Sequence, residues 1–236
     1  MHIDHCGKVL PLDAANAAST DADKRRTKNY TYIGEDLLRR LIDITVATLA
    51  LALLFPLLVL VAAAIRLDSR GHVLFSQLRC GCGNRPFRLL KFRTMTVDAE
   101  ERLPLVLAAS PEARAEYERY HKLTSDPRMT RVGAVLRRLS IDELPQLVNV
   151  IRGDMTLVGP RPYLLREREC IGAALPLVLS VPPGITGLWQ ITARNGCSFN
   201  DRVAIDCEYV RQRSLKFDLA LLIATIPVVL RGHDAH

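Results

Sequence analysis

The chain has 236 residues and a mass of 26.3 kDa, which fits one domain or one domain with an appendage. Hydrophobic residues make up 49% and charged residues 24%, enough apolar surface to exclude disorder throughout. Because the charges are spread along most of the chain, a transporter with many membrane spans is also excluded. The net charge of +7 favours an anionic partner, such as phosphate, nucleic acid or an anionic membrane face.

The first segment, residues 1–32, is polar and rich in alanine. It contains a basic cluster of Lys24, Arg25, Arg26 and Lys28. We expect a mobile basic tail here rather than a secretory signal, because no apolar stretch precedes Leu37.

A long apolar segment follows. From Ile44 to Ile65 there are 22 residues without a charge, or roughly 33 Å of helix, against ~30 Å for a bilayer core. The alternative, a core helix of a soluble protein, is disfavoured because the segment is apolar on all faces. Pro56 deletes a backbone hydrogen bond near the middle, and both flanks are basic. We therefore predict a re-entrant membrane helix hairpin over residues 33–66, broken at Pro56, with both ends on the cytoplasmic side.

The remaining sequence predicts a mixed α/β fold. Two alternating segments, 73–79 and 87–92, flank a stretch rich in Gly and predict a small β-hairpin. Charged residues over 98–122 predict solvent-facing amphipathic helices. Apolar periodicity predicts helices over 129–139 and 144–151, and a core or interfacial helix over 219–230.

The stretch from Leu136 to Pro162 is the most informative part of the sequence. Ser140 and Glu143 have the spacing of a capping box, but Pro145 leaves open whether Ser140 or Asp142 is the N-cap. With either N-cap, Asp142 and Glu143 lie at a helix start, where backbone N–H groups favour anions. Plain helix capping would explain a lone Ser-x-x-Glu, but it does not require the Gly-Asp-Met and Gly-Pro-Arg-Pro that follow.

Three other segments carry candidate groups. Pro160 and Pro162 stiffen the backbone around Arg161, which suits a guanidinium that binds phosphate, although a surface-loop arginine is the simpler interpretation. Residues 91–95 close the hairpin with the cations Lys91 and Arg93, but a basic strand edge is common. The turn over 183–190 contains the only tryptophan, which alone indicates core packing.

Together these segments resemble the bacterial sugar transferases, the monotopic phosphoglycosyl transferases. The resemblance covers roughly residues 33–230, and its most specific part is the block from Asp142 to Pro162. It is strongest to the short form that initiates succinoglycan-type exopolysaccharide as an undecaprenyl-phosphate galactose phosphotransferase. The other matching motifs are the apolar hairpin with Pro56, Leu74-Phe75 with Gln77 and Arg79, Lys91–Met95, Asp126–Arg128, Pro183–Gln190, Arg194, and Asp206 with Tyr209.

The resemblance implies transfer of a hexose 1-phosphate from a UDP-sugar to undecaprenyl phosphate, with release of UMP, as the first membrane step of exopolysaccharide synthesis. It implies that Asp142 is the nucleophile, which forms an aspartyl-phosphosugar intermediate, and that Glu143 is the ligand of Mg²⁺. It also implies a set of phosphate- or substrate-binding residues, in which the role of Asp206 is open: Lys91, Arg93, Arg137, Arg161, Arg194 and Asp206.

By the same resemblance, residues 67–236 form the catalytic domain on the cytoplasmic face of the bacterial inner membrane, in contact with its lipid. Galactose is the favoured sugar, glucose and N-acetylated sugars are alternatives, and the oligomeric state is open, with a homodimer as one alternative. A nucleic-acid-binding protein is disfavoured by 6% aromatic residues and by the apolar segment. A non-catalytic basic membrane scaffold is disfavoured by the Asp142–Glu143 pair.

Overall fold

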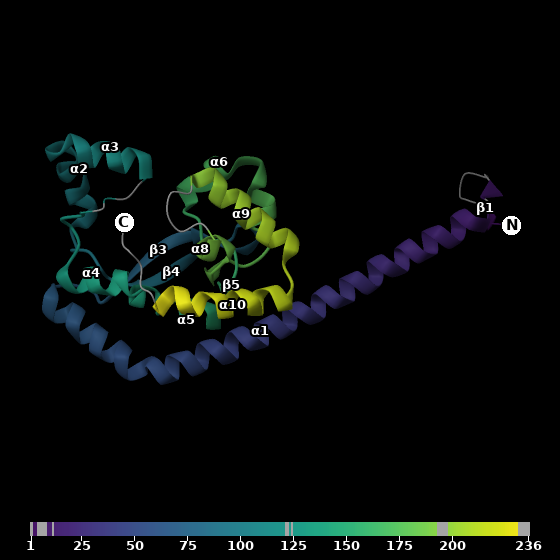
Figure 1. The fold of residues 1–236 in the computed structure, drawn as a ribbon, viewed down its shortest axis with the longest axis horizontal. Helices are drawn as coiled ribbons and strands as arrows, with labels where there is room; N and C mark the ends of the chain where they lie inside the picture. The colour runs from purple at the N-terminus through teal and green to yellow at the C-terminus, as the bar shows by residue number, and fades with distance from the viewer. Residues whose placement is uncertain are drawn as a thin grey trace. The chain divides into compact units, whose positions relative to one another are not determined.

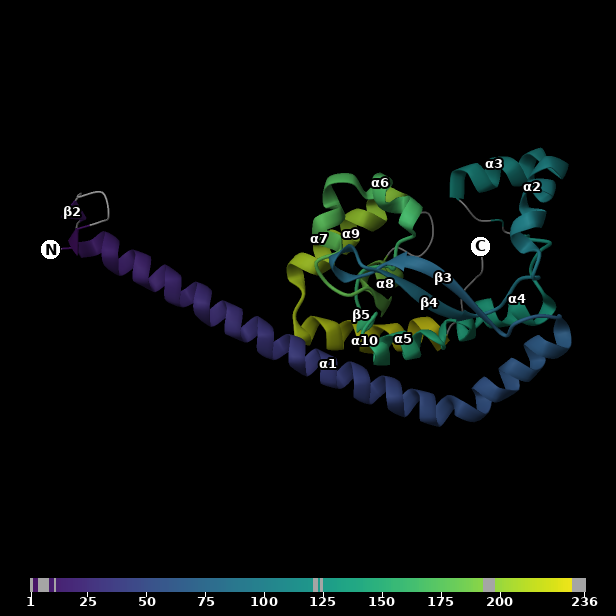
Figure 2. The ribbon, with the colours of Figure 1, turned by 180° about the vertical axis from the view of Figure 1, so that it is seen from behind.

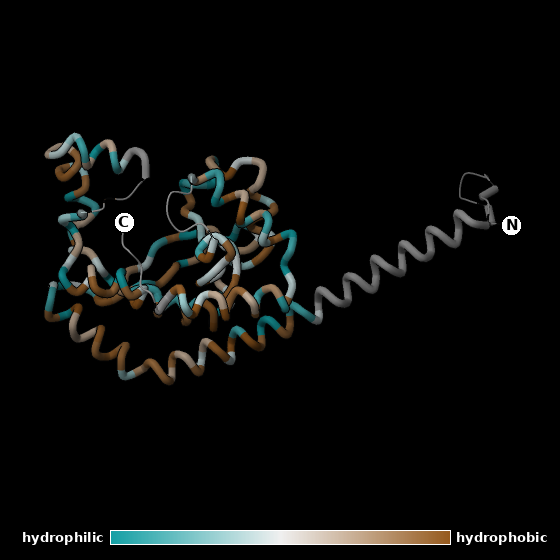
Figure 3. Tube along the Cα trace, viewed as in Figure 1, coloured by the Kyte–Doolittle hydropathy of each residue, from teal (hydrophilic) through white to brown (hydrophobic). Residues whose placement is uncertain are grey.

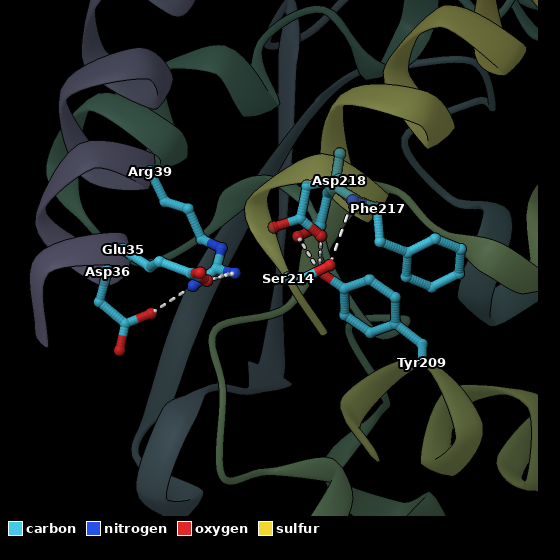
Figure 4. A network of polar contacts seen from close by, with 8 residues as sticks. Glu35, Asp36, Arg39, Tyr209, Ser214, Phe217 and Asp218 are labelled. Atoms are coloured by element: carbon cyan, nitrogen blue, oxygen red, sulfur yellow. Dashed lines mark hydrogen bonds and ion pairs between the residues drawn. The ribbon is translucent and has the colours of Figure 1, made fainter. Parts of the chain in front are cut away.

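The computed structural model describes residues 2–3, 9–10, 12–120, 123, 125–192 and 198–230. The chain separates into two compact units, Met1–Ile42 and Asp43–His236. The first unit contains a short antiparallel sheet of β1 (His2–Ile3) and β2 (Val9–Leu10) and the first part of α1 (Leu12–Asp68). Within it, Arg39 forms ion pairs of 2.8 and 2.9 Å with Glu35 and Asp36, one turn earlier on the same helix (Figure 4). The mobility of residues 1–32 stays a prediction.

Helix α1 contains one candidate membrane segment, Gly34–Asp68, which is long and apolar enough to cross a membrane by length and composition. Only 11% of its most apolar window is buried, and Leu53 is 81% exposed. The tube of this part of α1 is mostly brown, that is hydrophobic, in Figure 3. A core helix of a soluble protein would bury most of this surface. The helix is continuous through Pro56 and changes direction in its C-terminal part (Figures 1 and 2).

The second unit is mostly helical, with small sheets, as Figure 1 shows. This confirms the mixed fold class. After α1 come the elements β3 (Leu74–Cys80), η1 (Cys82–Asn84), β4 (Pro86–Phe92), α2 (Ala99–Ala109), α3 (Pro111–Tyr120), α4 (Arg131–Arg138), η2 (Ile141–Glu143), α5 (Gln146–Arg152), β5 (Thr156–Val158), η3 (Leu165–Glu167), α6 (Arg168–Ile171), η4 (Gly172–Ala174), α7 (Leu175–Val178), β6 (Gly184–Thr186), α8 (Leu188–Thr192), α9 (Phe199–Gln212) and α10 (Leu215–Leu230).

The predicted hairpin is confirmed. Strands β3 and β4 pair antiparallel from Leu74↔Phe92 to Cys80↔Pro86. The connection turns back at Gly83 and Asn84, whose φ angles of 61° and 63° lie in the left-handed region that Gly and Asn tolerate best. The predicted helices at 98–122, 129–139 and 219–230 are present as α2, α3, α4 and α10.

Of the two capping alternatives, Ser140 is the N-cap residue, but of a 3₁₀ turn and not of the α-helix that follows. It has φ 56° and ψ 18°, a left-handed conformation in place of the usual extended one, and its side chain makes no capping hydrogen bond. Asp142 and Glu143 lie on the single 3₁₀ turn η2, and α5 begins afterwards, with Pro145 as its N-cap. The reason is steric: Pro145 suits the start of a helix, where no N–H is needed, and not its interior.

A buried tyrosine, Tyr209, joins the C-terminal helices to the core. Tyr209 is fully buried, and its hydroxyl oxygen lies within hydrogen-bond distance of two acceptors, Asp218 at 2.7 Å and the carbonyl of Val158 at 3.0 Å. Figure 4 shows this contact beside Phe217, whose ring stacks on Tyr209 and whose N–H donates to Ser214. The end of β5 and the helices α9 and α10 are therefore fixed to one another.

Candidate active site

The hairpin and α5 are joined by Asn149, which is fully buried. Its side-chain oxygen accepts the N–H of Leu90 at 2.9 Å, and its amide nitrogen donates to the carbonyl of Arg88 at 2.8 Å and to Asp154 at 3.1 Å. A buried amide with these partners sets the register of β4 against α5. Lys91, on β4, is thereby held beside the turn that precedes α5.

Helix α4 is packed closely against the end of the hairpin. A side chain at Gly133 would meet the carbonyl of Thr94 at 2.0 Å, so only glycine permits this approach. Thr130 caps the helix through its hydroxyl and donates its N–H to the same carbonyl at 3.0 Å. At the other end of α4, Arg137 Nε donates to the hydroxyl of Thr94 at 3.0 Å, which places the guanidinium near the hairpin.

Asp142, Glu143 and Lys91 form the charged centre of the site. Lys91 Nζ lies 2.6 Å from Glu143 Oε1 and 3.8 Å from Asp142 Oδ2. The Asp142 side chain is only 9% exposed, whereas 36% of the Glu143 side chain is exposed. The predicted pair is therefore two distinct groups: a shielded carboxylate, and an accessible one that a cation already contacts.

The groups around Asp142 shift the pKa of its carboxyl in opposite directions. Burial raises the pKa of the Asp142 carboxyl above its ordinary value, and the charge of Glu143 adds to this, while Lys91 and Arg137 lower it. A carboxylate that is desolvated and held by nearby cations is weakly hydrated and fixed in place. Those properties suit a nucleophile that attacks phosphorus.

The segment Pro160–Pro162 leaves the end of β5, and its position depends on two glycines. Strands β5 and β6 pair in parallel, and a side chain at Gly184 would meet the backbone N of Gly159 at 2.1 Å. Gly159 donates to the carbonyl of Thr186, and Gly184 to that of Pro160, both at 2.9 Å. The Gly-Pro-Arg-Pro motif thus has a packing reason, since a Cβ at either glycine would separate the strands.

Trp189 is not packed in the core as its sequence context indicated. It is half-buried on α8, and two guanidinium groups lie over its ring: Arg161 at 5.4 Å from the ring centroid and Arg202 at 4.8 Å. Both distances are within the range of cation–π attraction. The indole therefore orients Arg161 as well as filling space.

Arg79 links the Arg161 segment to the charged centre. It lies on the same face of the hairpin as Lys91, because the register pairs Phe75 with Lys91 and Arg79 with Phe87. Burial, together with the charge of Arg161, lowers the pKa of Arg79 to about 10, although Glu167 and Glu143 partly offset this shift. The charges of Arg161 and Glu143 thus both act on one half-buried guanidinium.

The predicted site residues separate into three groups. Lys91, Asp142 and Glu143 are in contact, and Arg137 also acts electrostatically on Asp142. Arg161 and Asp206 form a second group, since Asp206 accepts the Arg161 backbone N–H at 3.1 Å.

Arg93 stands apart from both groups. Arg93 is buried and donates to the carbonyls of Ser69 and Arg70 at 2.8 and 2.6 Å, so it holds the hairpin to the chain that follows α1. Arg194 lies outside the described residues.

Three residues with contacts that hold segments together were not predicted from the sequence as functional or structural positions. Asn149 sits in a run of apolar residues, where a lone amide is a signal of a buried polar contact. Asp43, just before the uncharged segment, accepts the Thr156 hydroxyl at 2.7 Å and the Leu157 N–H at 3.0 Å, and so fixes β5. Arg79 was quoted only as part of a motif.

The carboxylates offer a partial metal site. Among the described residues, no three His, Cys, Asp or Glu side chains gather into a group that could hold an ion. Glu143 and Asp142 are two hard oxygen donors, and Mg²⁺ is usually bound by one or two carboxylates, with water and substrate phosphates completing its shell. The residues present therefore fit a Mg²⁺ that arrives with, or is completed by, a diphosphate.

This chain is similar to known proteins over most of its length. The profile of the bacterial sugar transferase family matches residues 34–232. This chain belongs to the bacterial sugar transferase family. The family resemblance and the enzyme class predicted from the sequence are thereby confirmed.

Three relatives have names that describe an activity or a pathway. The exopolysaccharide production protein ExoY of Rhizobium meliloti is 44% identical over 84% of this chain and 88% of its own length. The undecaprenyl-phosphate galactose phosphotransferase of Salmonella typhimurium is 40% identical over 84% of this chain, which spans 42% of that protein. The UDP-glucose:undecaprenyl-phosphate glucose-1-phosphate transferase of Caulobacter vibrioides is 40% identical over 86% of this chain and 74% of its own length.

Proposed function

We propose that this sugar transferase moves a hexose 1-phosphate from a UDP-sugar to undecaprenyl phosphate and releases UMP, as the first membrane step of exopolysaccharide synthesis. The observation that carries the proposal is the contact of Lys91 with the Asp142–Glu143 pair, at 3.8 and 2.6 Å, in a chain of this family. The names of the galactose and glucose relatives support the donor class and the lipid acceptor.

The reaction follows two displacements at one phosphorus. A carboxylate oxygen of Asp142 attacks the sugar-bearing phosphorus, the bond from that phosphorus to the bridging oxygen breaks, and UMP leaves with both bonding electrons. A phosphate oxygen of the lipid then attacks the same phosphorus, and the bond to Asp142 breaks and regenerates the carboxylate. Each substrate thus visits the site in turn, which suits a water-soluble nucleotide and a lipid that stays in the bilayer.

The other groups of the site stabilise the transferred charge. Arg161 and Arg137 offer guanidinium donors to phosphate oxygens, and Lys91 supplies a cation between the two carboxylates. Glu143 would hold Mg²⁺, which supplies charge neutralisation of the diphosphate when bound. Arg194 completes the proposed phosphate-binding set.

We also propose that residues 33–66 form a re-entrant helix that keeps both flanks on the cytoplasmic face of the inner membrane. Support comes from the exposed apolar surface of α1, its change of direction and the basic flanks. The test is to label single cysteines, Tyr30→Cys and Ser110→Cys, in a variant whose native cysteines are replaced. Both should react only after the cells are opened; reaction of one of them in intact cells contradicts the re-entrant topology.

The sugar is tested by a panel of donors. Purified enzyme is incubated with undecaprenyl phosphate and Mg²⁺ and with UDP-galactose, UDP-glucose or an N-acetylated UDP-sugar, and UMP release is measured. We expect UDP-galactose to give the highest kcat/KM, because the sequence motifs resemble those of a galactose-loading form. Equal or higher turnover with UDP-glucose would reassign the donor, and no UMP with any donor would contradict the proposed function.

A further inference from the structure

We propose that Arg79 and Asp206 are positioning residues that hold the segment Pro160–Pro162 from two sides and thereby fix the Arg161 guanidinium for the substrate phosphate. The role rests on the proposed function, because Arg161 matters only if a phosphate binds there. Neither residue needs to touch the substrate. The argument uses the backbone of the segment, its two partners and the position of the guanidinium.

The backbone of the segment has few groups by which it can be held. Pro160 and Pro162 lack N–H groups, so the N–H of Arg161 is the one backbone donor of the triplet. Asp206 Oδ2 accepts it at 3.1 Å, and the carbonyl of Pro160 accepts from Gly184 at 2.9 Å. The carbonyl of Pro162 accepts from Arg79 Nη1 at 2.9 Å.

Asp206 holds one side from a rigid position. It is fully buried on α9, between Val203 and Cys207, which both pack in the core. The same oxygen that accepts the Arg161 N–H also accepts the hydroxyl of Tyr163 at 2.7 Å. One carboxylate oxygen therefore fixes two positions of the chain, directly before and after Pro162. Burying a charge is costly, and these contacts offset part of that cost.

Arg79 holds the other side from the hairpin. Its second nitrogen, Nη2, donates to Gln77 Oε1 at 2.6 Å, which fixes the plane of the guanidinium that contacts Pro162. The next residue, Cys80, donates its N–H to the carbonyl of Tyr163 at 2.8 Å. The segment is thus joined to β3, which is paired with β4, the strand that carries Lys91. A shift of the hairpin would therefore also move Arg161.

The Arg161 guanidinium lies against Trp189, with Cζ 5.4 Å from the ring centroid. Its Nε is buried and has no hydrogen-bond partner among the described residues. The neighbouring charges of Arg79 and Arg202 are also positive, so an anion would be attracted to this place. A fixed guanidinium, with an Nε–H that the described residues leave unpaired, is suited to a phosphate oxygen.

A double-mutant cycle tests the inference. Asp206→Asn and Arg79→Gln are made in the natural chain and in Arg161→Ala, and UMP release from UDP-galactose and UDP affinity are measured. In the natural background, each should lower kcat/KM about 10- to 100-fold. In Arg161→Ala, each should cost less than about 3-fold, because the group it positions is gone.

Matched controls are Glu208→Gln, on the same helix as Asp206, and Arg166→Gln, an exposed arginine near Arg79. Both should change kcat/KM less than about 2-fold in either background. Thermal unfolding checks that each variant folds, and Tyr163→Phe, which removes one contact to Asp206 and leaves the carboxylate, provides a milder variant. It too should lose its effect in Arg161→Ala.

Equal losses in both backgrounds would overturn the positioning role and leave a structural one. That result differs from failure of the proposed function, in which the natural chain itself releases no UMP from any donor. If the natural chain releases no UMP, or if Arg161→Ala is too slow to assay, the double-mutant cycle is carried out on the affinity for UDP instead of kcat/KM. Additive losses of UDP affinity would again contradict the inference.

Discussion

Asp142 and Asp206 are both buried carboxylates, and burial raises the pKa of each. Their partners differ. Asp142 stands beside another carboxylate and a lysine ammonium at 3.8 Å. Asp206 faces a tyrosine hydroxyl and a backbone N–H, at 2.7 and 3.1 Å, and the more distant charges of Arg161 and Arg202.

This difference in partners indicates a catalytic role for Asp142 and a structural role for Asp206. A carboxylate whose neighbours are charged side chains can exchange their contacts for a substrate phosphate and a metal ion. A carboxylate whose neighbours belong to the backbone and to a buried ring holds the chain in place. Burial and pKa alone do not distinguish the two cases, whereas the identity of the hydrogen-bond partners does. Substitution of Asp142 should therefore affect the reaction directly, whereas substitution of Asp206 should affect the fold around Arg161.

The largest expected effect is at Asp142. Asp142→Asn keeps the shape of the side chain but removes the nucleophile, so kcat should fall by at least ~10³-fold. Thermal unfolding should change little, because the amide can occupy the same space. A variant that retains more than a tenth of the natural turnover would contradict the role of Asp142.

Next in size is the loss at Glu143. Glu143→Gln should lower kcat about 10²- to 10³-fold, because the diphosphate charge is then less well neutralised. Its side chain is 36% exposed, so folding should be unaffected. Removal of Mg²⁺ with a chelator should be as damaging in the natural chain and should add little in Glu143→Gln. Unchanged turnover with the chelator would exclude Glu143 as a metal ligand.

At Asp206 the expected effect is on stability and its pH dependence. The pKa of Asp206 is raised from 3.8 to about 6, chiefly by burial, so the folded state binds the proton more tightly than the unfolded state. The stabilisation from this group is complete below pH ~4 and is lost as the pH rises through about 6. Relative to Asp206→Asn, the free energy of unfolding should fall by ~2 kcal/mol between pH 4 and 7.

Chemical denaturation at several pH values provides the measurement for Asp206. The two proteins should differ in the slope of stability against pH between these limits. Parallel curves would show that Asp206 does not titrate between the folded and unfolded states as proposed.

The smallest expected effect is at Tyr163. Tyr163→Phe removes the hydroxyl that donates to Asp206, and it should destabilise the fold by about 1–2 kcal/mol. Because that hydrogen bond lowers the pKa of Asp206, its loss should raise this pKa and extend the pH-dependent window upward. The same denaturation series detects the shift. An unchanged window would mean that the hydroxyl does not contact the ionised carboxylate.

Local patterns predicted much of this structure. The alternation around Gly83 and Asn84 gave the hairpin, and the apolar periodicity gave α4 and α10. The N-cap alternative at Asp142 was wrong, and Ser140 is the N-cap only of the 3₁₀ turn η2, because α5 begins at Gln146, after Pro145. Local spacing identified the steric limit at Pro145 but did not predict a separate 3₁₀ turn before it.

Contacts between distant segments were beyond local patterns. Leu90 and Asn149 are 59 positions apart, and Asp43 and Thr156 are 113 apart. These contacts depend on how the strands and helices pack, and local patterns in a single sequence do not reveal that packing. For the same reason, the sequence could place Asp206 near the site only by resemblance, while its role required the contacts with Arg161 and Tyr163.

The central claim is that Asp142 carries the sugar phosphate. The most direct test incubates the enzyme with UDP-galactose and Mg²⁺ but no lipid acceptor and measures the mass of the intact protein. The claim predicts release of UMP and a mass increase of one hexose phosphate that is absent in Asp142→Asn and present in Asp206→Asn. An enzyme that turns over with lipid, yet forms neither adduct nor UMP without it, would show direct transfer between two bound substrates and contradict the claim.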